Sequence, residues 1–154
     1  MVRLSDLTDW DRQHILNADV PTFEGRPWTT PSPPAERRVA IVTTAGLHPR
    51  GDSPFTPGIG DYRIIPGNCS SDELVMSHVS SNFDRTGFQE DLNVIFPIDR
   101  LREMAGHGDF GSLAEFHYSF MGGGTHPAWM RESALKVIKF LREDQVNTVL
   151  LVPV

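Results

Sequence analysis

The stretch Arg38-Val-Ala-Ile-Val-Thr-Thr-Ala-Gly-Leu-His-Pro-Arg-Gly-Asp52 gives the clearest signal of fold class in the chain. It opens with a short apolar run rich in β-branched residues, which predicts a central strand buried on both faces of a parallel sheet. The run then turns polar and breaks at a glycine. Ligands of open α/β sheets bind outside the carboxyl ends of the strands. We therefore expect a site there, on a loop rather than in the core, formed by Thr43, Thr44, His48, Arg50 and Asp52.

Composition and charge narrow the class of protein. The 154 residues fit one domain that can bury a core, and 39% apolar with 22% charged residues is typical of a globular protein. The net charge of −6 argues against a nucleic-acid or anionic-membrane surface. We expect no signal peptide and no membrane span, because no apolar run is long enough. A lone cysteine, Cys69, excludes an intramolecular disulfide framework and favours a reduced, cytoplasmic setting.

Residues 1–37 are predicted to form an N-terminal helix and a proline-rich arm. Ser5 as the N-cap favours a short helix up to Leu16. The closely spaced prolines that follow exclude regular helix. We expect an extended arm that lies on the domain or on a partner, with Phe23 and Trp28 as its anchors.

Residues 38–154 are predicted to form one α/β domain. Apolar runs alternate with amphipathic segments at the spacing of parallel crossovers. After the first strand, the expected strands are Tyr62–Ile65, Leu74–His78, Leu113–Phe120 and a buried last strand, Thr148–Val152. The expected helices are Ile98–Ala105, closed by Gly106 or Gly108, and Met130–Leu141, capped by Thr125. This order predicts a three-layer, mostly parallel sheet of the Rossmann-like or flavodoxin-like kind.

The loop Ser77–Phe88 follows a predicted strand and concentrates hydrogen-bonding and charged side chains. His78, Asn82, Asp84 and Arg85 can recognise a carboxylate or an amine, with Arg85 forming a bidentate fork. The alternative is a surface loop whose polar groups satisfy one another.

Other polar features allow more than one interpretation. Gly122-Gly-Gly124 can cradle an anion with its amides or serve as a hinge. The six histidines include no tight metal motif, so structural roles are favoured. A metal-dependent hydrolase would instead require three metal ligands to converge from the set His48, His78, His117, His126 and Asp84.

Several long strings, in the same order along the chain, resemble one family. These strings are Val39-Ala-Ile-Val-Thr-Thr-Ala-Gly-Leu-His48, Tyr62-Arg-Ile-Ile-Pro-Gly67, Ser77-His78 through Asn82-Phe-Asp-Arg85, Asp91-Leu-Asn-Val-Ile-Phe-Pro-Ile-Asp-Arg-Leu-Arg-Glu103, Gly111-Ser-Leu-Ala114, His117-Tyr-Ser-Phe-Met-Gly122 and Val149-Leu-Leu-Val-Pro-Val154. From Arg38 to Val154, the chain resembles the selenoprotein B family of the glycine/sarcosine/betaine reductases, which includes D-proline reductase subunits.

The resemblance implies reductive cleavage of a C–N bond in a small amino-acid-like substrate. In the family, a selenolate or thiolate attacks a substrate that a partner subunit holds through a pyruvoyl group, so partner reductase subunits are implied. No metal is expected. The implied catalytic residues are His78, for proton transfer, and Asp84, for orientation. The implied substrate-binding residues are Thr43, Thr44, His48, Arg85 (for a carboxylate), Ser119 and Gly122.

The family pattern continues with selenocysteine or cysteine directly after the segment like Leu150–Val154. Because selenocysteine is encoded by a codon otherwise read as stop, we expect the reading frame to have been ended there. The domain would then be incomplete, with its nucleophile expected just beyond Val154, and the chain alone would lack reductase activity. An alternative is a non-enzymatic binding or assembly domain, in which apolar surface on the last strand favours self-association into a homo-oligomer.

Overall fold

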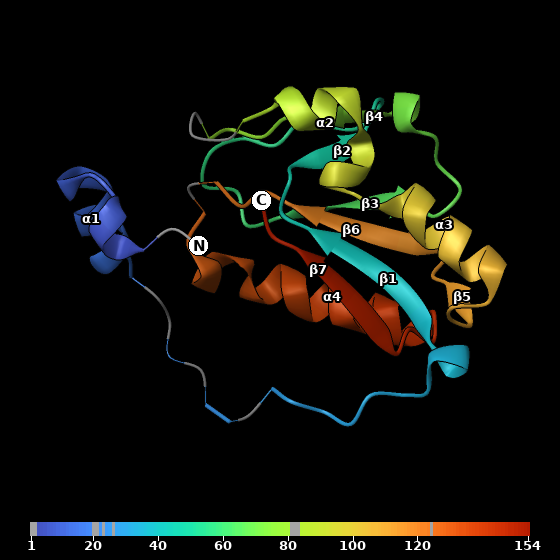
Figure 1. Cartoon of the computed structure of the whole chain (residues 1–154). Coiled ribbons are helices and arrows are strands. Elements are labelled where there is room, and N and C mark those ends of the chain that lie inside the picture. The colour runs from blue at the N-terminus through green and yellow to red at the C-terminus, as the bar shows by residue number, and fades with distance from the viewer. Residues whose placement is uncertain (1–2, 20–21, 23, 26, 81–83, 124) are drawn as a thin grey trace.

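The computed structural model describes residues 3–19, 22, 24–25, 27–80, 84–123 and 125–154 (Figure 1). The strands are β1 (Arg38–Thr43), β2 (Leu47–Pro49), β3 (Tyr62–Pro66), β4 (Leu74–Met76), β5 (Ser112–Leu113), β6 (Phe116–Phe120) and β7 (Thr148–Val152). The α-helices are α1 (Asp9–Leu16), α2 (Thr86–Glu90), α3 (Ile98–His107) and α4 (Arg131–Glu143). The 3-10 helices are η1 (Leu4–Asp6), η2 (Pro34–Glu36), η3 (Ser71–Glu73), η4 (Leu92–Val94) and η5 (Pro127–Met130). None of the described helices has the length and apolar character needed to cross a membrane.

Strand β1 is the centre of the main sheet, as its apolar sequence predicts. It pairs in parallel with β5, β6 and β7, while β3 runs antiparallel to β6. Strands β2 and β4 form a separate antiparallel pair. The predicted α/β fold with a mostly parallel sheet is confirmed. The Rossmann-like or flavodoxin-like assignment stays a prediction.

Successive side chains of β1 enter two different hydrophobic clusters, because side chains alternate between the faces of a strand. Val39 and Ile41 pack in the cluster that includes Leu101 of α3. Ala40 packs in the cluster that includes Val137 and Leu141 of α4. Figure 1 shows α4 along one face of the sheet, and α3 with the β2–β4 pair on the other. The chain therefore forms three layers.

The last strand differs from the prediction. Thr148–Val152 is a strand, but its expected burial is wrong, since Leu151 is 69% exposed and Val149 39%. The physical reason is its position: β7 pairs with β1 and forms an edge of the sheet. An apolar sequence thus lies at an edge rather than in the centre.

The single strand expected over Leu113–Phe120 is interrupted at its second residue. Strand β5 ends at Leu113 and β6 begins at Phe116. Between them, the Glu115 N–H donates to a carboxylate oxygen of Asp144 at 2.7 Å, and the Glu115 carbonyl accepts from Gly67 N at 2.7 Å. These distant partners take the backbone groups that a continuous ladder would have used.

The loops contain more structure than expected, and two helix caps differ. Strand β2 includes His48, which was expected on a loop, and α2 begins inside the predicted loop Ser77–Phe88. Thr8, rather than Ser5, caps α1 by accepting from Asp11 N. His126, rather than Thr125, caps the last helical segment by accepting from Ala128 N. Gly108, with φ +82°, closes α3, one of the two glycines expected to do so.

None of the described residues of the N-terminal segment, up to Arg37, is buried. Trp28 is 86% exposed, so it does not anchor the segment on the domain, whereas its role as an anchor on a partner stays a prediction. Phe23, the other expected anchor, and Pro21 lie outside the described residues. The end of the segment is fixed where Pro34 O accepts from Gly111 N at 3.1 Å. The division of the chain at residue 37 stays a prediction.

Candidate functional site

The carboxyl ends of β1, β6 and β7 meet around the side chain of Thr44. The Val154 N–H donates to Thr44 Oγ1 at 2.8 Å, and Thr44 Oγ1 lies 3.3 Å from the Val154 carbonyl oxygen. The backbone N–H of Thr44 donates to Val152 O at 3.1 Å. One hydroxyl thus fixes the end of β7 beside β1.

Gly122 allows the end of β6 to come equally close. Its N–H donates to Thr44 O at 3.0 Å. A Cβ at this position would lie 2.9 Å from Thr44 Cβ and 3.0 Å from Val154 O, closer than side chains tolerate. Thr44, Gly122 and Val154 therefore form a compact corner of backbone groups and one hydroxyl, and the substrate-binding roles of Thr44 and Gly122 stay a prediction.

The segment after β4 borders this corner. The Ser77 N–H donates to Gly46 O at 3.0 Å, and a Cβ at Gly46, where φ is +66°, would lie 3.2 Å from His78 Cα. A Cβ at Gly123 would lie 3.2 Å from His78 Cε1 and 3.0 Å from Ser80 Cβ. The structure thus brings His78 beside the glycines that follow β6.

His78 is buried, and its environment favours the neutral imidazole. Burial lowers its pKa, and the nearby positive charge of Arg85 lowers the pKa further. Nδ1 of His78 accepts from Ser80 N at 3.3 Å. A neutral imidazole at this edge has the chemistry to accept a proton near pH 7.

Arg85 and Asp84 make local contacts in the segment between β4 and α2. The Arg85 guanidinium donates to His78 O at 2.7 Å and to Ser80 O at 3.1 Å. The exposed carboxylate of Asp84 accepts from Thr86 N at 2.9 Å, and this hydrogen bond lowers the Asp84 pKa. Their predicted roles toward a substrate remain untested. Asn82 lies outside the described residues.

Thr43, His48 and Ser119 lie in strands and are buried, so the expectation of a loop position is wrong for the first two. Thr43 Oγ1 donates to Ile95 O at 3.0 Å. Ser119 Oγ accepts from Leu47 N at 2.8 Å. His48 Nδ1 lies 2.9 Å from Pro49 O. These three side chains contact backbone groups inside the domain, and the neighbouring residues in the sequence do not predict these contacts.

The remaining expected loop residues lie toward η3. The Arg50 guanidinium donates to Asp72 O at 2.8 Å, and Arg50 N donates to Glu73 O at 2.8 Å. Asp52 is exposed, with its N–H donating to Pro49 O at 2.9 Å.

His117 has a buried role that the sequence does not indicate. Its Nδ1 accepts from the backbone N–H of Ile41 at 3.0 Å, in the gap between the β1–β5 and β1–β6 pairings. Its side chain is fully buried, and burial lowers its pKa to about 4. The neutral imidazole thus accepts a hydrogen bond from the Ile41 N–H, which has no backbone partner among the described residues at this gap in the sheet.

The metal-dependent hydrolase is not supported. It requires at least three of the five candidate ligands to converge, and all five are described. The described part of the chain holds no group of three His, Cys, Asp or Glu side chains placed to bind a metal ion.

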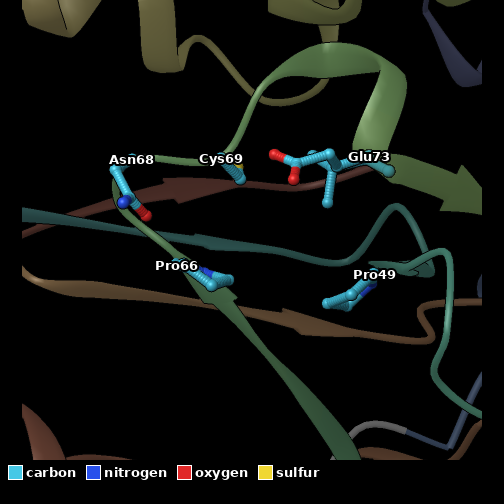
Figure 2. A pocket seen from close by; sticks show the side chains of 6 residues that line it. Pro49, Pro66, Asn68, Cys69 and Glu73 are labelled. Atoms are coloured by element: carbon cyan, nitrogen blue, oxygen red, sulfur yellow. The ribbon is translucent and has the colours of Figure 1, made fainter.

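A pocket of about 210 Å³ surrounds Cys69, away from the Thr44 corner. Figure 2 shows Cys69 between Asn68 and Glu73, with Pro66 and Pro49 across from it. Burial raises the pKa of the Cys69 thiol, although the Arg102 cation opposes this shift. A thiol with a raised pKa is a poor nucleophile at neutral pH, so Cys69 fits a structural role better than a catalytic one.

The structure defines the class as an α/β domain with a mostly parallel sheet, in which polar groups meet at the carboxyl ends of β1, β6 and β7. The chain belongs to the glycine/sarcosine/betaine reductase selenoprotein B family, whose sequence model matches residues 21–154. The match confirms the resemblance seen from Arg38 onward and extends it into the N-terminal arm.

Individual relatives are subunits of reductases. The chain is 36% identical over 115 residues to the D-proline reductase subunit gamma of Acetoanaerobium sticklandii, covering 73% of this chain and 47% of the relative. It is 27% identical over 143 residues to the glycine reductase complex component B subunit gamma of Symbiobacterium thermophilum, covering 86% and 32%. It is 31% identical over 120 residues to the sarcosine reductase complex component B subunit beta of Peptoclostridium acidaminophilum, covering 74% and 27%. The chain thus spans about half or less of these relatives, and no solved structure matches it.

Proposed function

We propose that this chain forms part of a reductase-complex subunit and provides one wall of an amino-acid site at the carboxyl ends of β1, β6 and β7. The convergence of Thr44, Gly122 and Val154, with His78 beside them, is the observation that supports this proposal. The relatives named above are subunits of reductases that act on D-proline, glycine and sarcosine. Parallel α/β sheets bind ligands at this edge.

The proposed reaction breaks a C–N bond of the substrate. A selenolate or thiolate bonds to the carbon as the C–N bond breaks, and the amine leaves with a proton. A dithiol then supplies two electrons and becomes a disulfide, while the new carbon–selenium or carbon–sulfur bond breaks, the carbon takes up a proton and the selenol or thiol is regenerated. Arg85 would bind the substrate carboxylate, His78 would transfer a proton and Asp84 would help to orient the loop. Because Cys69 is buried elsewhere with a raised pKa, the selenol or thiol would come from outside these 154 residues.

A Thr44→Val substitution tests this proposal in a protein extended beyond Val154 by a cysteine-containing segment of the D-proline reductase type. The assay is dithiol-dependent reduction of D-proline, glycine, sarcosine and betaine in the presence of partner subunits. We expect reduction of one of these substrates and a kcat loss of about tenfold to a hundredfold in Thr44→Val, because the end of β7 loses its hydroxyl contacts.

Thr148→Val, at the opposite end of β7, is the matched control and should keep full activity. Absence of reduction with all four substrates would contradict the proposed reaction. Equal activity of Thr44→Val and Thr148→Val would contradict the position of the site.

The exposed edge at β7 supports a second candidate function, assembly with another copy of this chain. Val149, Leu150 and Leu151 are all more than a third exposed, and an apolar edge strand is a template for pairing across a two-fold axis. We expect Leu151→Lys to weaken such a dimer by at least about tenfold, since a lysine opposes edge pairing. Light scattering after size exclusion measures the change, with Leu135→Lys on α4 as the exposed apolar control. A wild-type chain that stays monomeric at high concentration would rule out this assembly.

A further inference from the structure

We propose that a pocket at the amino-terminal end of β6, between β3 and the end of α4, binds a small alkylammonium ion. The pocket has a volume of about 390 Å³, which is within the range of small-molecule sites. It lies at the opposite end of β6 from Gly122, so it is separate from the proposed reductase site. This proposal does not depend on the proposed function.

Three large apolar side chains are exposed into this one pocket. Phe116 is 38% exposed, Phe140 37% and Ile64 40%, and all three line it. The ring of Tyr62, which does not line the pocket itself, packs 6.5 Å from that of Phe140 and 6.2 Å from that of Tyr118. Aromatic faces attract cations, most strongly when the cation is weakly hydrated.

A tyrosine that lines the pocket carries a hydroxyl without a hydrogen-bond partner in the described part of the chain. Tyr118 is only 2% exposed, and its hydroxyl makes no hydrogen bond within the described part of the chain. Burial, with the negative charges of Asp144 and Glu143, raises its pKa to about 12, so the hydroxyl stays protonated at neutral pH. A protonated tyrosine hydroxyl keeps an oxygen that can accept a hydrogen bond from an ammonium N–H.

Carboxylates at the rim supply the negative charge. Glu115 and Glu143 are exposed and line the pocket, while Lys139 lies 3.9 Å from Glu143. Asp144 lines it too, but its carboxylate is paired with Arg38. The two glutamates therefore provide most of the net charge. Aromatic walls, a hydroxyl acceptor and exposed carboxylates together suit a group that is both apolar and cationic.

Titration of the chain with n-butylammonium chloride, followed by two-dimensional 15N–1H NMR at constant ionic strength, tests the proposal. We expect saturable shifts at the amides of residues 115–118 and 140–144, and unchanged amides at Thr44 and Gly122. Butan-1-ol, which has the same tail without the charge, should give no saturable shift. Equal shifts with butan-1-ol, shifts centred on Thr44, or no saturation with butylammonium would each overturn the proposal.

Matched variants separate the contributions that the carboxylate and the aromatic ring make to butylammonium binding. Glu143→Gln should weaken binding by about two- to fivefold through the lost charge, and Phe140→Leu by about two- to fivefold through the lost ring. Glu132→Gln, in the first turn of the same helix, is the control and should bind as the wild type does. The two test positions are at least a third exposed, so folding should survive, and the spectra themselves report it. Unchanged affinity in both test variants would contradict the assignment.

Discussion

Asp144→Ala is expected to lower the free energy of unfolding by about 3 kcal/mol, because it leaves a partly buried arginine without its partner. The Arg38 side chain is 28% exposed and that of Asp144 16%. The guanidinium also donates to Asp144 O at 2.7 Å and to Leu113 O at 2.6 Å. The other carboxylate oxygen of Asp144 accepts from Glu115 N at 2.7 Å. One side chain thus joins the start of β1, the interruption between β5 and β6, and the end of α4.

Urea unfolding measures the expected change as a lower midpoint at an unchanged m-value. A loss of about 3 kcal/mol corresponds to a fall in Tm of roughly 6–12 °C for a chain of this size. Glu103→Ala is the control, because its ion pair with Arg100 is more than half exposed on both sides and should contribute less than about 1 kcal/mol. If both variants lose the same small amount, the Arg38–Asp144 pair does not organise this end of the sheet.

The sequence predicted the elements whose signals are local. The apolar run at β1, the stripe of α4 and the glycine that ends α3 all lie within a few residues of the structure they determine. The burial of β7 was predicted wrongly, because an apolar strand gives the same pattern at a sheet edge as at its centre. Only the pairing of strands distinguishes the two, and pairing depends on residues far away in the chain.

The same limit applies to the candidate site. Thr43 and Thr44 are adjacent and chemically alike, but Thr43 Oγ1 donates to a carbonyl 52 residues away, whereas Thr44 Oγ1 contacts Val154 at the end of β7. Alternation along the strand turns one hydroxyl inward and leaves the other at the corner. Polarity after a buried strand therefore indicates the edge where a site lies, but not which of its residues face that site.

His117 should make the chain lose about 3 kcal/mol of stability as the pH falls from 7 to 4. In the folded chain, burial lowers its pKa from 6.5 to about 4, so the unfolded chain binds the extra proton between these values. Stability from this group is therefore complete above about pH 6.5, is lost as the pH falls from there to the folded pKa of about 4, and changes little below it. His78, whose pKa is also lowered, adds to the loss in the same direction.

His117→Asn isolates the contribution of this one group. The asparagine Oδ1 can accept the Ile41 N–H in place of Nδ1, and it has no proton to gain over this range. We expect urea unfolding at pH 7, 6, 5 and 4 to show a shallower fall for His117→Asn than for the wild type, even though the smaller side chain lowers its stability at pH 7. His107→Asn, at the exposed end of α3, should keep the wild-type slope. Parallel slopes for the wild type and His117→Asn would mean that His117 has the same pKa in the folded and the unfolded chain. A protonated imidazole could not accept the Ile41 N–H through Nδ1, so this contact would then need another explanation.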